Sequence, residues 1–298
     1  MKNEYERGLV TTLAILIIFS SFFFYNEWKI EKEIEEKRVT EEERLNIIRN
    51  TLESLTISAK AISVYDDTDS VKIYGKNDDK VLPIASLVKT LTILTSLKEN
   101  GTEKVVSITP SAIAQNGDFG LFVNEKWRIG DLSKLTIISS ANDGAFILSE
   151  ISDDFMEKMR ITANEVGMKD FLILNSTGLD ILTSNSKSGA SARAEDINKL
   201  NLFALWHYPR IFISSSLSNL NLVSESGFSH NATNTNLMIG KIPNLLFSKT
   251  GNTELAGGNL SIIFKDKREH IIAITILGST SMGRFTDMEK IIAVLSFF

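Results

Sequence analysis

The sequence predicts an α+β domain that follows a long N-terminal helical segment. Three observations indicate this class: strand-like runs stand at both ends of the globular part, helix-like runs fill its middle, and 298 residues with 43% apolar composition suffice for a sizeable core. We expect the distant strands to complete one antiparallel sheet flanked by helices. The formal net charge of −5 offers no basic excess, which argues against a nucleic-acid partner.

Composition also excludes several kinds of chemistry. The chain has no cysteine, so disulfides, thiol catalysis and iron–sulfur clusters are ruled out. Its three histidines are far apart, and none forms the i, i+4 pair of a zinc-binding helix: His207, His230 and His270. We therefore expect neither a metal nor a cofactor. His207 stands between Trp206 and Tyr208, where a packed histidine is favoured over a general base.

The first element is an uncharged apolar segment at residues 8–26. As a helix it would span about 28 Å, close to the hydrocarbon thickness of a bilayer. No small-x-small cleavage site follows, which favours an uncleaved, single-pass membrane anchor over a signal peptide, with residues 1–7 in the cytoplasm. Lysines follow the segment closely, so the positive-inside rule does not favour an outside C-terminus. The extracytoplasmic placement of the domain is assigned from function.

The next segment, residues 27–57, is strongly charged, with 6 basic and 9 acidic side chains. Leu45, Ile48, Leu52 and Leu55 recur at 3-4-3 spacing and form one narrow apolar stripe. This pattern predicts a solvated helical stalk. A short coiled coil between two chains is the alternative, but one heptad pair does not establish it.

The remaining residues, 58–298, carry the predicted domain. Ala61–Tyr65 and Val71–Tyr74 flank a turn-rich stretch, which indicates a β-hairpin. Ile84–Leu97 is apolar on nearly all sides and predicts a buried helix. The other expected elements are helices at Leu132–Ile151 and Phe155–Val166, strands at Leu245–Ser248, Asn259–Phe264 and Ile271–Leu277, and a closing helix at Met288–Phe298.

Ser86 and Lys89 form the most informative pair. A spacing of three on a helix places both side chains on one face, about 5–6 Å apart at Cβ. A serine hydroxyl is a weak nucleophile unless a base takes its proton, and a lysine is such a base only if burial and nearby positive charge keep it neutral. The pair indicates a serine nucleophile, although Ser-x-x-Lys alone also occurs by chance.

Two further motifs strengthen this interpretation. Ser140-Ala141-Asn142 lies in a stretch of small residues between apolar runs. Lys249-Thr250-Gly251 follows a strand-like run, and Gly251 permits close approach of a backbone or ligand. Together and in this order, the three motifs match the active-site set of penicillin-binding proteins and serine β-lactamases.

The chain from about residue 59 to residue 298 resembles the low-molecular-mass D-alanyl-D-alanine carboxypeptidases of the S11 peptidase family. Further matches occur in the same order at Tyr74-Gly75-Lys76-Asn77, Asn142-Asp143, Glu165–Met168, Asn175–Leu179, Asn234-Thr235-Asn236 and Ala256-Gly257. Arg284 lies 35 residues after Lys249, where the family carries a substrate-binding arginine. The resemblance implies the β-lactamase/DD-peptidase-like fold, with a helical subdomain beside the sheet.

The resemblance also implies roles for the polar side chains. Ser86 attacks the carbonyl between two D-alanines and forms an acyl-enzyme, with Lys89 as the base. Ser140 and Lys249 relay a proton to the leaving D-alanine. Asn142 orients Lys89 and the peptide carbonyl of the substrate.

Substrate binding is implied at the end of the last motif. The backbone N–H groups of Ser86 and Asn252 form the oxyanion hole. Thr250 and Arg284 bind the terminal carboxylate, beside Gly251, and a guanidinium suits this task because it holds a carboxylate bidentately.

Three positions depart from the family pattern. Asn252 stands where relatives often have histidine or threonine, which should matter little because the backbone donates there. Ser176 replaces a proline and is expected to loosen its loop. Ala141 replaces a glycine, and its methyl group is expected to narrow the cleft.

The implied function is a membrane-anchored serine D,D-carboxypeptidase that removes the terminal D-alanine of peptidoglycan stem peptides and is inhibited covalently by β-lactams. A D,D-endopeptidase that cleaves cross-links stays open, because both activities occur in the family. A β-lactamase is disfavoured because the chain has no Glu-x-x-Leu-Asn segment. An inactive wall-binding homologue is disfavoured because the motif residues are intact.

Overall fold

The computed structural model describes the backbone of residues 2–297 and the side chains of residues 19–297. The chain divides into two compact units, with the division between Thr51 and Leu52. Each unit is described by itself.

One helix, α1 (Lys2–Ser54), makes up the first unit and extends a few residues past it. Its exposed surface carries ion pairs one helical turn apart, such as Lys29–Glu33 and Lys32–Glu36. Such pairs stabilise a solvated helix by a few tenths of a kcal/mol each, about 0.2–0.5. The predicted anchor, residues 8–26, lies largely outside the residues whose side chains are described. Within the described residues, no helix is both long and apolar enough to cross a membrane.

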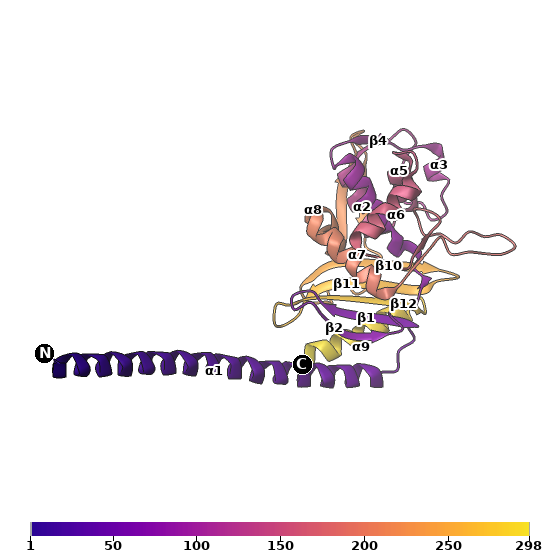
Figure 1. Cartoon of the computed structure of the whole chain (residues 1–298). Coiled ribbons are helices and arrows are strands. Elements are labelled where there is room, and N and C mark those ends of the chain that lie inside the picture. The colour runs from indigo at the N-terminus through magenta and orange to yellow at the C-terminus, as the bar shows by residue number, and fades with distance from the viewer. Residues whose placement is uncertain (1, 298) are drawn as a thin grey trace. The chain divides into compact units, whose positions relative to one another are not determined.

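A five-stranded sheet forms the centre of the second unit (Figure 1). The strands follow the order β10-β11-β12-β1-β2, so the two ends of the domain meet in one sheet. Ala61 of β1 lies opposite Leu277 of β12 in antiparallel register, which confirms the predicted pairing of distant segments. The strands are β1 (Ala61–Asp66), β2 (Val71–Lys76), β10 (Leu245–Thr253), β11 (Gly257–Lys265) and β12 (Ile271–Ser279).

Helices cover both faces of this sheet. α7 (Ala194–His207) packs on β1 and β12, and α9 (Gly283–Phe297) packs on β11 and β12 from the opposite side (Figure 1). The buried helix α2 (Lys89–Asn100) contacts α7 and the helices α4, α5 and α6, whose ranges follow, and its apolar side chains join theirs in one core. The other helices are α3 (Pro110–Ile113), α4 (Ile129–Ser139), α5 (Asn142–Glu150), α6 (Phe155–Val166), α8 (Pro209–Phe212) and the 3₁₀ turns η1 (Ala85–Val88) and η2 (Ile213–Ser216).

Short strands connect these helices. They form one three-stranded and two two-stranded sheets among the described residues: β3 (Leu82–Pro83), β6 (Leu172–Ile173) and β7 (Ala190–Ala192); β4 (Val105–Ser107) and β5 (Lys126–Arg128); β8 (Asn219–Val223) and β9 (Ser229–Thr233). The sequence did not predict them, because most are too short to show a period of two.

Four predicted boundaries are wrong. The helix expected at Ile84–Leu97 is the 3₁₀ turn η1 followed by α2, which continues to Asn100, so Ser86 lies in the turn and Lys89 begins the α-helix. The single helix expected at Leu132–Ile151 is two helices, α4 and α5, because Ser140 adopts a left-handed conformation with φ of 61°, which ends a right-handed helix. The strand expected to end at Ser248 continues to Thr253, since β11 supplies partners along its whole length. The closing helix begins at Gly283 rather than Met288, and the Thr280 hydroxyl accepts a hydrogen bond from the Gly283 N–H at that end.

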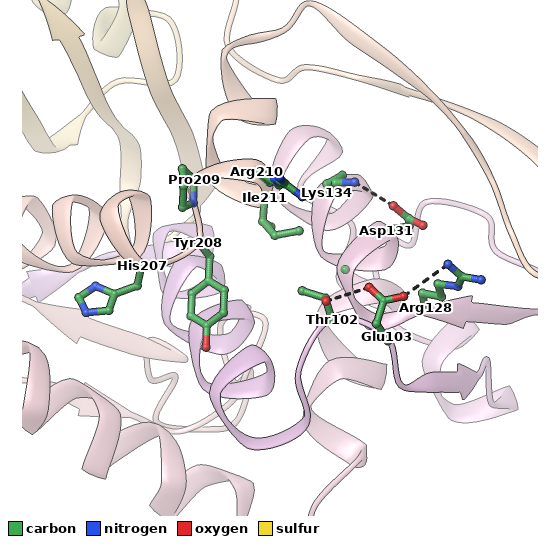
Figure 2. A pocket seen from close by; sticks show the side chains of 11 residues that line it. Thr102, Glu103, Arg128, Asp131, Lys134, His207, Tyr208, Pro209, Arg210 and Ile211 are labelled. Atoms are coloured by element: carbon green, nitrogen blue, oxygen red, sulfur yellow. Dashed lines mark hydrogen bonds and ion pairs between the residues drawn. The ribbon is translucent and has the colours of Figure 1, made fainter.

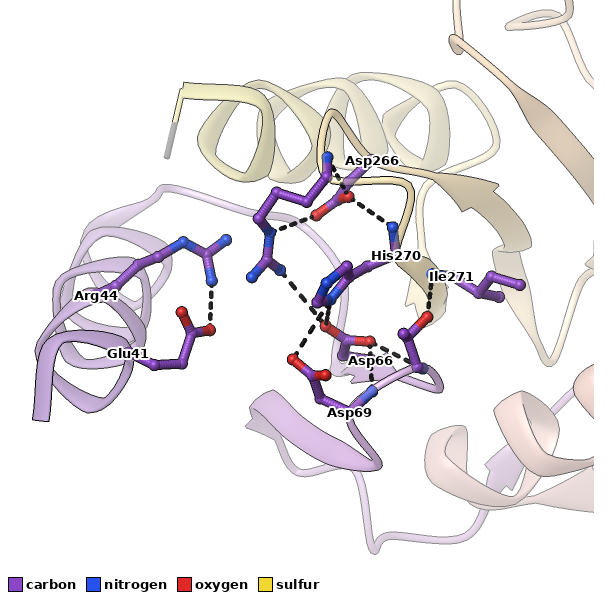
Figure 3. Close-up of polar contacts among 9 residues, drawn as sticks. Glu41, Arg44, Asp66, Asp69, Asp266, His270 and Ile271 are labelled. Atoms are coloured by element: carbon purple, nitrogen blue, oxygen red, sulfur yellow. Dashed lines mark hydrogen bonds and ion pairs between the residues drawn. The ribbon is translucent and has the colours of Figure 1, made fainter. Parts of the chain in front are cut away.

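A polar network links two turns at one end of the sheet (Figure 3). Asp66, at the end of β1, accepts hydrogen bonds from the backbone N–H groups of Thr68 and Asp69. Its other oxygen lies 2.9 Å from Nδ1 of His270 and 3.4 Å from the guanidinium of Arg268, both in the turn after β11. Asp66, Asp69 and His270 are potential metal ligands, but these donors already occupy the Asp66 carboxylate. We interpret the cluster as a structural link.

Candidate active site

The predicted nucleophile lies where a strained turn enters helix α2. Ala85, directly before Ser86, is buried with φ of 48°, a conformation that costs a non-glycine residue about 1–3 kcal/mol. Strand β10 packs directly against this turn. A Cβ on Gly251 would lie only 2.7 Å from the Ile84 carbonyl oxygen, so no larger residue fits there without a shift. The turn aims Ser86 toward Lys89 at the start of α2, where Nζ donates to the Ser86 hydroxyl over 2.8 Å.

Lys89 is completely buried, and its partners are neutral oxygens. Besides Ser86, its Nζ donates to the backbone carbonyl of Thr177 over 2.7 Å. Burial lowers the pKa of Lys89 to about 7, against the opposing charge of Asp143. A lysine with this pKa is deprotonated in part at neutral pH, so it can take the Ser86 proton.

Lys249, in strand β10, contacts Ser140, which lies between α4 and α5. Its Nζ donates to the Ser140 hydroxyl over 2.8 Å and to the carbonyl of Thr250 over 2.9 Å. Burial lowers the pKa of Lys249 well below its usual value, and the positive charges of Lys89 and Arg284 lower it further. The helix break at Ser140 presents this hydroxyl to Lys249, so the two form a second amine–hydroxyl pair.

Asn142 and Asp143 hold the loop that borders the cleft. The Asn142 side-chain amide donates to the Asn116 carbonyl over 2.6 Å. Asp143 Oδ2 accepts the backbone N–H groups of residues 119–121 at 3.0–3.3 Å, while burial raises the pKa of this carboxyl. The Oδ1 atom of Asn142 is buried without a partner among the described residues. The orienting contact that the resemblance implies, from Asn142 to Lys89, is not among the hydrogen bonds of the described residues.

The residues implied in substrate binding lie at the end of β10. Thr250 is buried, with its hydroxyl 2.6 Å from that of Thr235. Arg284, in the first turn of α9, donates from Nη1 to the carbonyl of Gly251 over 2.7 Å, and its buried Nε has no partner among the described residues. Asn252 follows in an exposed position on the same strand. The cationic Arg284 therefore stands beside the proposed carboxylate site.

The structure adds groups that sequence reasoning missed. The Thr177 carbonyl and the Thr235 hydroxyl lie in stretches that match the family pattern, but sequence reasoning gave neither group a role. The loop with Ser176 is well held, because the Ser176 hydroxyl accepts from Ser149 over 2.9 Å and its carbonyl accepts from Thr92 over 2.7 Å. The expected loosening is therefore wrong.

The expected effect of Ala141 is also wrong. Its side chain is only 2% exposed and belongs to the hydrophobic core. The methyl group therefore packs inward instead of narrowing the cleft.

Two pockets of about 470 and 430 Å³ lie away from the three motifs. Figure 2 shows the larger pocket, which Thr102, Arg128, Lys134 and Tyr208 help to line. His207 also lines it, and its ring stacks on Phe203 with centroids 3.8 Å apart. This packing agrees with the prediction that His207 is not a general base.

Comparison with known proteins identifies the family. The model of the Peptidase S11 family, D-alanyl-D-alanine carboxypeptidase, matches residues 48–280. The chain belongs to this family. It is a serine enzyme of the D-alanyl-D-alanine carboxypeptidase group, as the sequence predicted.

Two curated relatives illustrate the range of this S11 group. A D-alanyl-D-alanine endopeptidase from Pseudomonas aeruginosa is 27% identical over 241 residues, which cover 76% of this chain and 74% of that protein. The D-alanyl-D-alanine carboxypeptidase DacF from Bacillus subtilis is 25% identical over 254 residues. That alignment covers 82% of this chain but only 63% of DacF.

Solved structures confirm the predicted fold. Penicillin-binding protein D2 from Listeria monocytogenes, in its ampicillin-bound form, matches with a TM-score of 0.68 and 26% identity, over 82% of this chain and 99% of that one. Its cefotaxime-bound form matches with a TM-score of 0.67 and 27% identity, over the same shares. The Streptomyces K15 DD-transpeptidase shares the fold at 18% identity, with a TM-score of 0.71 and coverage of 82% and 99%.

Proposed function

We propose that this S11 peptidase is a membrane-anchored serine D,D-carboxypeptidase that removes the terminal D-alanine from peptidoglycan stem peptides. The observation that carries the proposal is the completely buried Lys89, 2.8 Å from the Ser86 hydroxyl. A buried amine of lowered pKa beside a serine hydroxyl is suited to activate that hydroxyl at neutral pH.

Acylation follows from this geometry. Lys89, in its neutral form, takes the proton of Ser86 as Oγ bonds to the carbonyl carbon between the two D-alanines. The negative charge that develops on the carbonyl oxygen is received by the backbone N–H groups of Ser86 and Asn252. One such donor typically lowers the barrier by about 3–4 kcal/mol.

Release of D-alanine requires a proton on its nitrogen. Ser140 supplies it as the C–N bond breaks, and Lys249 replaces the proton on Ser140 through their 2.8 Å hydrogen bond. Lys249 regains its proton from Lys89, which had accepted one from Ser86, so that both amines return to their starting protonation states. Water then attacks the ester carbonyl while Lys89 takes a proton from it. The bond from the carbonyl carbon to Ser86 Oγ breaks, and Lys89 returns the proton to Oγ, which regenerates the Ser86 hydroxyl and the free amine.

The cationic groups of the cleft favour an anionic substrate end. The basic side chains Lys89, Lys249 and Arg284 lie near one another at β10. The carboxylate that acts electrostatically on Lys89, Asp143, already accepts hydrogen bonds from four backbone N–H groups. A terminal carboxylate at Thr250 and Arg284 would complete this charge balance. Its charge would also raise the pKa of Lys249 and favour the protonated amine that the leaving group needs.

A D,D-endopeptidase is the second candidate, supported by the relative from Pseudomonas aeruginosa that carries this name. The two activities share the acylation chemistry and differ in the size of the leaving group. A purified enzyme incubated with a monomeric pentapeptide and with a cross-linked dimer separates them. Release of D-alanine from the pentapeptide supports the carboxypeptidase, whereas turnover of the dimer alone contradicts it.

We also propose the placement of the enzyme. Residues 8–26 anchor it in the cell membrane and the helical segment at 27–57 spaces the domain from the bilayer, on the extracytoplasmic side where peptidoglycan lies. This follows from the uncharged run in the sequence and from the substrate. Protease digestion of intact cells tests it, because cleavage confined to lysed cells would contradict the exported placement.

The nucleophile is tested by labelling with a fluorescent penicillin. The wild-type protein is expected to form a stable covalent adduct, as suggested by the ampicillin-bound relative. Ser86→Ala is expected to abolish the adduct while the thermal unfolding midpoint stays the same. Failure of the wild type to label, under conditions where a known penicillin-binding protein does, would contradict the proposed enzyme.

A further inference from the structure

The loop at residues 175–180 contacts both the turn that carries Ser86 and the end of strand β10. A Cβ on Gly178 would lie only 2.1 Å from the Ala85 carbonyl oxygen, so the loop packs directly on the turn that carries the nucleophile. Its Thr177 carbonyl accepts the hydrogen bond from Lys89. Asn175 holds the loop closed from within, through its bonds to the Gly178 N–H and the Leu179 carbonyl.

Asp180 ends this loop and contacts the strand on the other side. One of its carboxylate oxygens accepts the Thr253 hydroxyl and the other accepts the Leu255 N–H, each at 3.0 Å. The Thr253 hydroxyl in turn accepts the N–H of Ala256 over 3.2 Å. Asp180 therefore binds the turn between β10 and β11 at two points.

This turn begins after Thr253, the residue that follows Asn252, whose N–H is the second donor of the proposed oxyanion hole. Strand β10 is the outer strand of its sheet, so β11 alone pairs with it as a neighbouring strand. Apart from β11, the last residues of β10 are contacted by Arg284 and the Ile84–Ser86 turn at Gly251, and by Asp180 at Thr253. Together with the pairing of Asn252 opposite Gly258 of β11, these contacts hold the end of β10 that carries Asn252.

We propose that Asp180 is a positioning residue, which through Thr253 and Leu255 fixes the Asn252 N–H at the distance from Ser86 that the oxyanion requires. The inference rests on the proposed function, because the role of Asn252 does. The same loop then positions two groups of the site: the Thr177 carbonyl orients the Lys89 amine, and Asp180 aligns the Asn252 N–H. Small displacements of such a donor reduce the rate, because its hydrogen bond strengthens only in the transition state.

The test compares Asp180→Ala and Asp180→Asn with the wild type in release of D-alanine. Asp180→Ala is expected to lower kcat about 10-fold, with KM changed less than about twofold, because the lost contact acts in the transition state. Asp180→Asn retains one acceptor and is expected to lose about threefold. Asp153→Ala, an exposed aspartate in the turn before α6, is the matched control and should behave as the wild type.

A double-mutant cycle tests the route through Thr253. If Asp180 acts through this hydroxyl, Asp180→Ala combined with Thr253→Val should be no slower than the slower single variant. Multiplied losses in the double variant would contradict the route. A kcat of Asp180→Ala within about twofold of the wild type would overturn the positioning role itself.

Hydrogen exchange supplies a readout that does not need activity. The amides of Leu255 and Ala256 should exchange at least about 10-fold faster in Asp180→Ala, while those of helix α2 stay protected. Unchanged exchange at these amides would overturn the inference even if the wild-type enzyme proved inactive. Loss of activity in the wild type itself would instead contradict the proposed function.

Discussion

Two lysines of this domain, Lys89 in α2 and Lys199 in α7, have opposite surroundings. Lys89 is fully buried and bonds to a hydroxyl and a carbonyl. Lys199 is 41% exposed and donates to the buried carboxylate of Asp196 over 2.9 Å. The comparison teaches that complete burial against neutral oxygens lowers the pKa of Lys89, whereas Lys199 stays partly exposed and serves as the hydrogen-bond partner of a buried carboxylate.

The Asp196 cluster shows the second case in detail. Burial acts to raise the pKa of Asp196, but hydrogen bonds from the Lys169 N–H, from Lys199 and from Arg193 hold it below its usual value. The charges of this cluster are thus satisfied within the fold. In the cleft, Lys249 instead faces the positive charges of Lys89 and Arg284, and the balance is left for a ligand.

The largest expected effect comes from removing each lysine's amine. Lys89→Met should lower the rate constant for acylation by a fluorescent penicillin by about 10³-fold, because the base for Ser86 is lost. Lys199→Met should leave this rate within about twofold of the wild type, since its amine serves only the Asp196 pair. Stopped-flow or quenched labelling measures both. Equal losses in the two variants would break the comparison.

The pH dependence of acylation gives a second test of the difference between Lys89 and Lys199. Burial lowers the pKa of Lys89 to about 7, and only the deprotonated amine accepts the Ser86 proton. The acylation rate should therefore rise about 10-fold per pH unit below this value and level off above about pH 8. Lys199→Met should keep the same profile. A rate that is flat between pH 5.5 and about 8 would contradict Lys89 as the base.

The smallest expected effect is on stability. The pKa of Lys89 is lowered to about 7 in the folded state but is about 10.4 in the unfolded chain. Between these values the unfolded state binds more protons, so wild-type stability rises with pH through this window; below it, the full cost of burying the charge remains. Lys89→Met should therefore be more stable at pH 6 by on the order of 1 kcal/mol.

This advantage should shrink above about pH 7 and reverse toward pH 9.5, because the folded amine is then neutral while the unfolded amine, with a pKa of about 10.4, still binds a proton. Urea unfolding midpoints at pH 6, 8 and 9.5 measure the difference, with Lys199→Met as the control that shows no such trend. A difference that stays constant across these pH values would contradict the lowered pKa.

Much of the fold followed from local pattern. The hairpin of β1 and β2, the helix α6 and the strands β11 and β12 appear where alternation and turn residues predicted them. The short strands and the break between α4 and α5 did not, because a left-handed Ser140 has no signature in a run of small and apolar residues. Its conformation depends on the neighbours that it meets in the fold.

The candidate site divides in the same way. Ser86, Lys89 and the Lys249 motif could be named from residue type, spacing and order. Ser140 was named in the same way, and the structure brings its hydroxyl to Lys249 across 109 positions. The Thr177 carbonyl that accepts from Lys89, 88 positions away, could not be named from the sequence.

The amino-acid sequence by itself determined the family, the order of the motifs and the pairing of the two ends of the domain in one sheet, because residue type and spacing indicate these directly. Only the tertiary structure decided how completely Lys89 is buried, how Ser140 reaches the amine of Lys249 and what holds the end of β10. The physical reason is that a pKa, a left-handed turn and a hydrogen-bond partner depend on burial and on atoms contributed by remote segments.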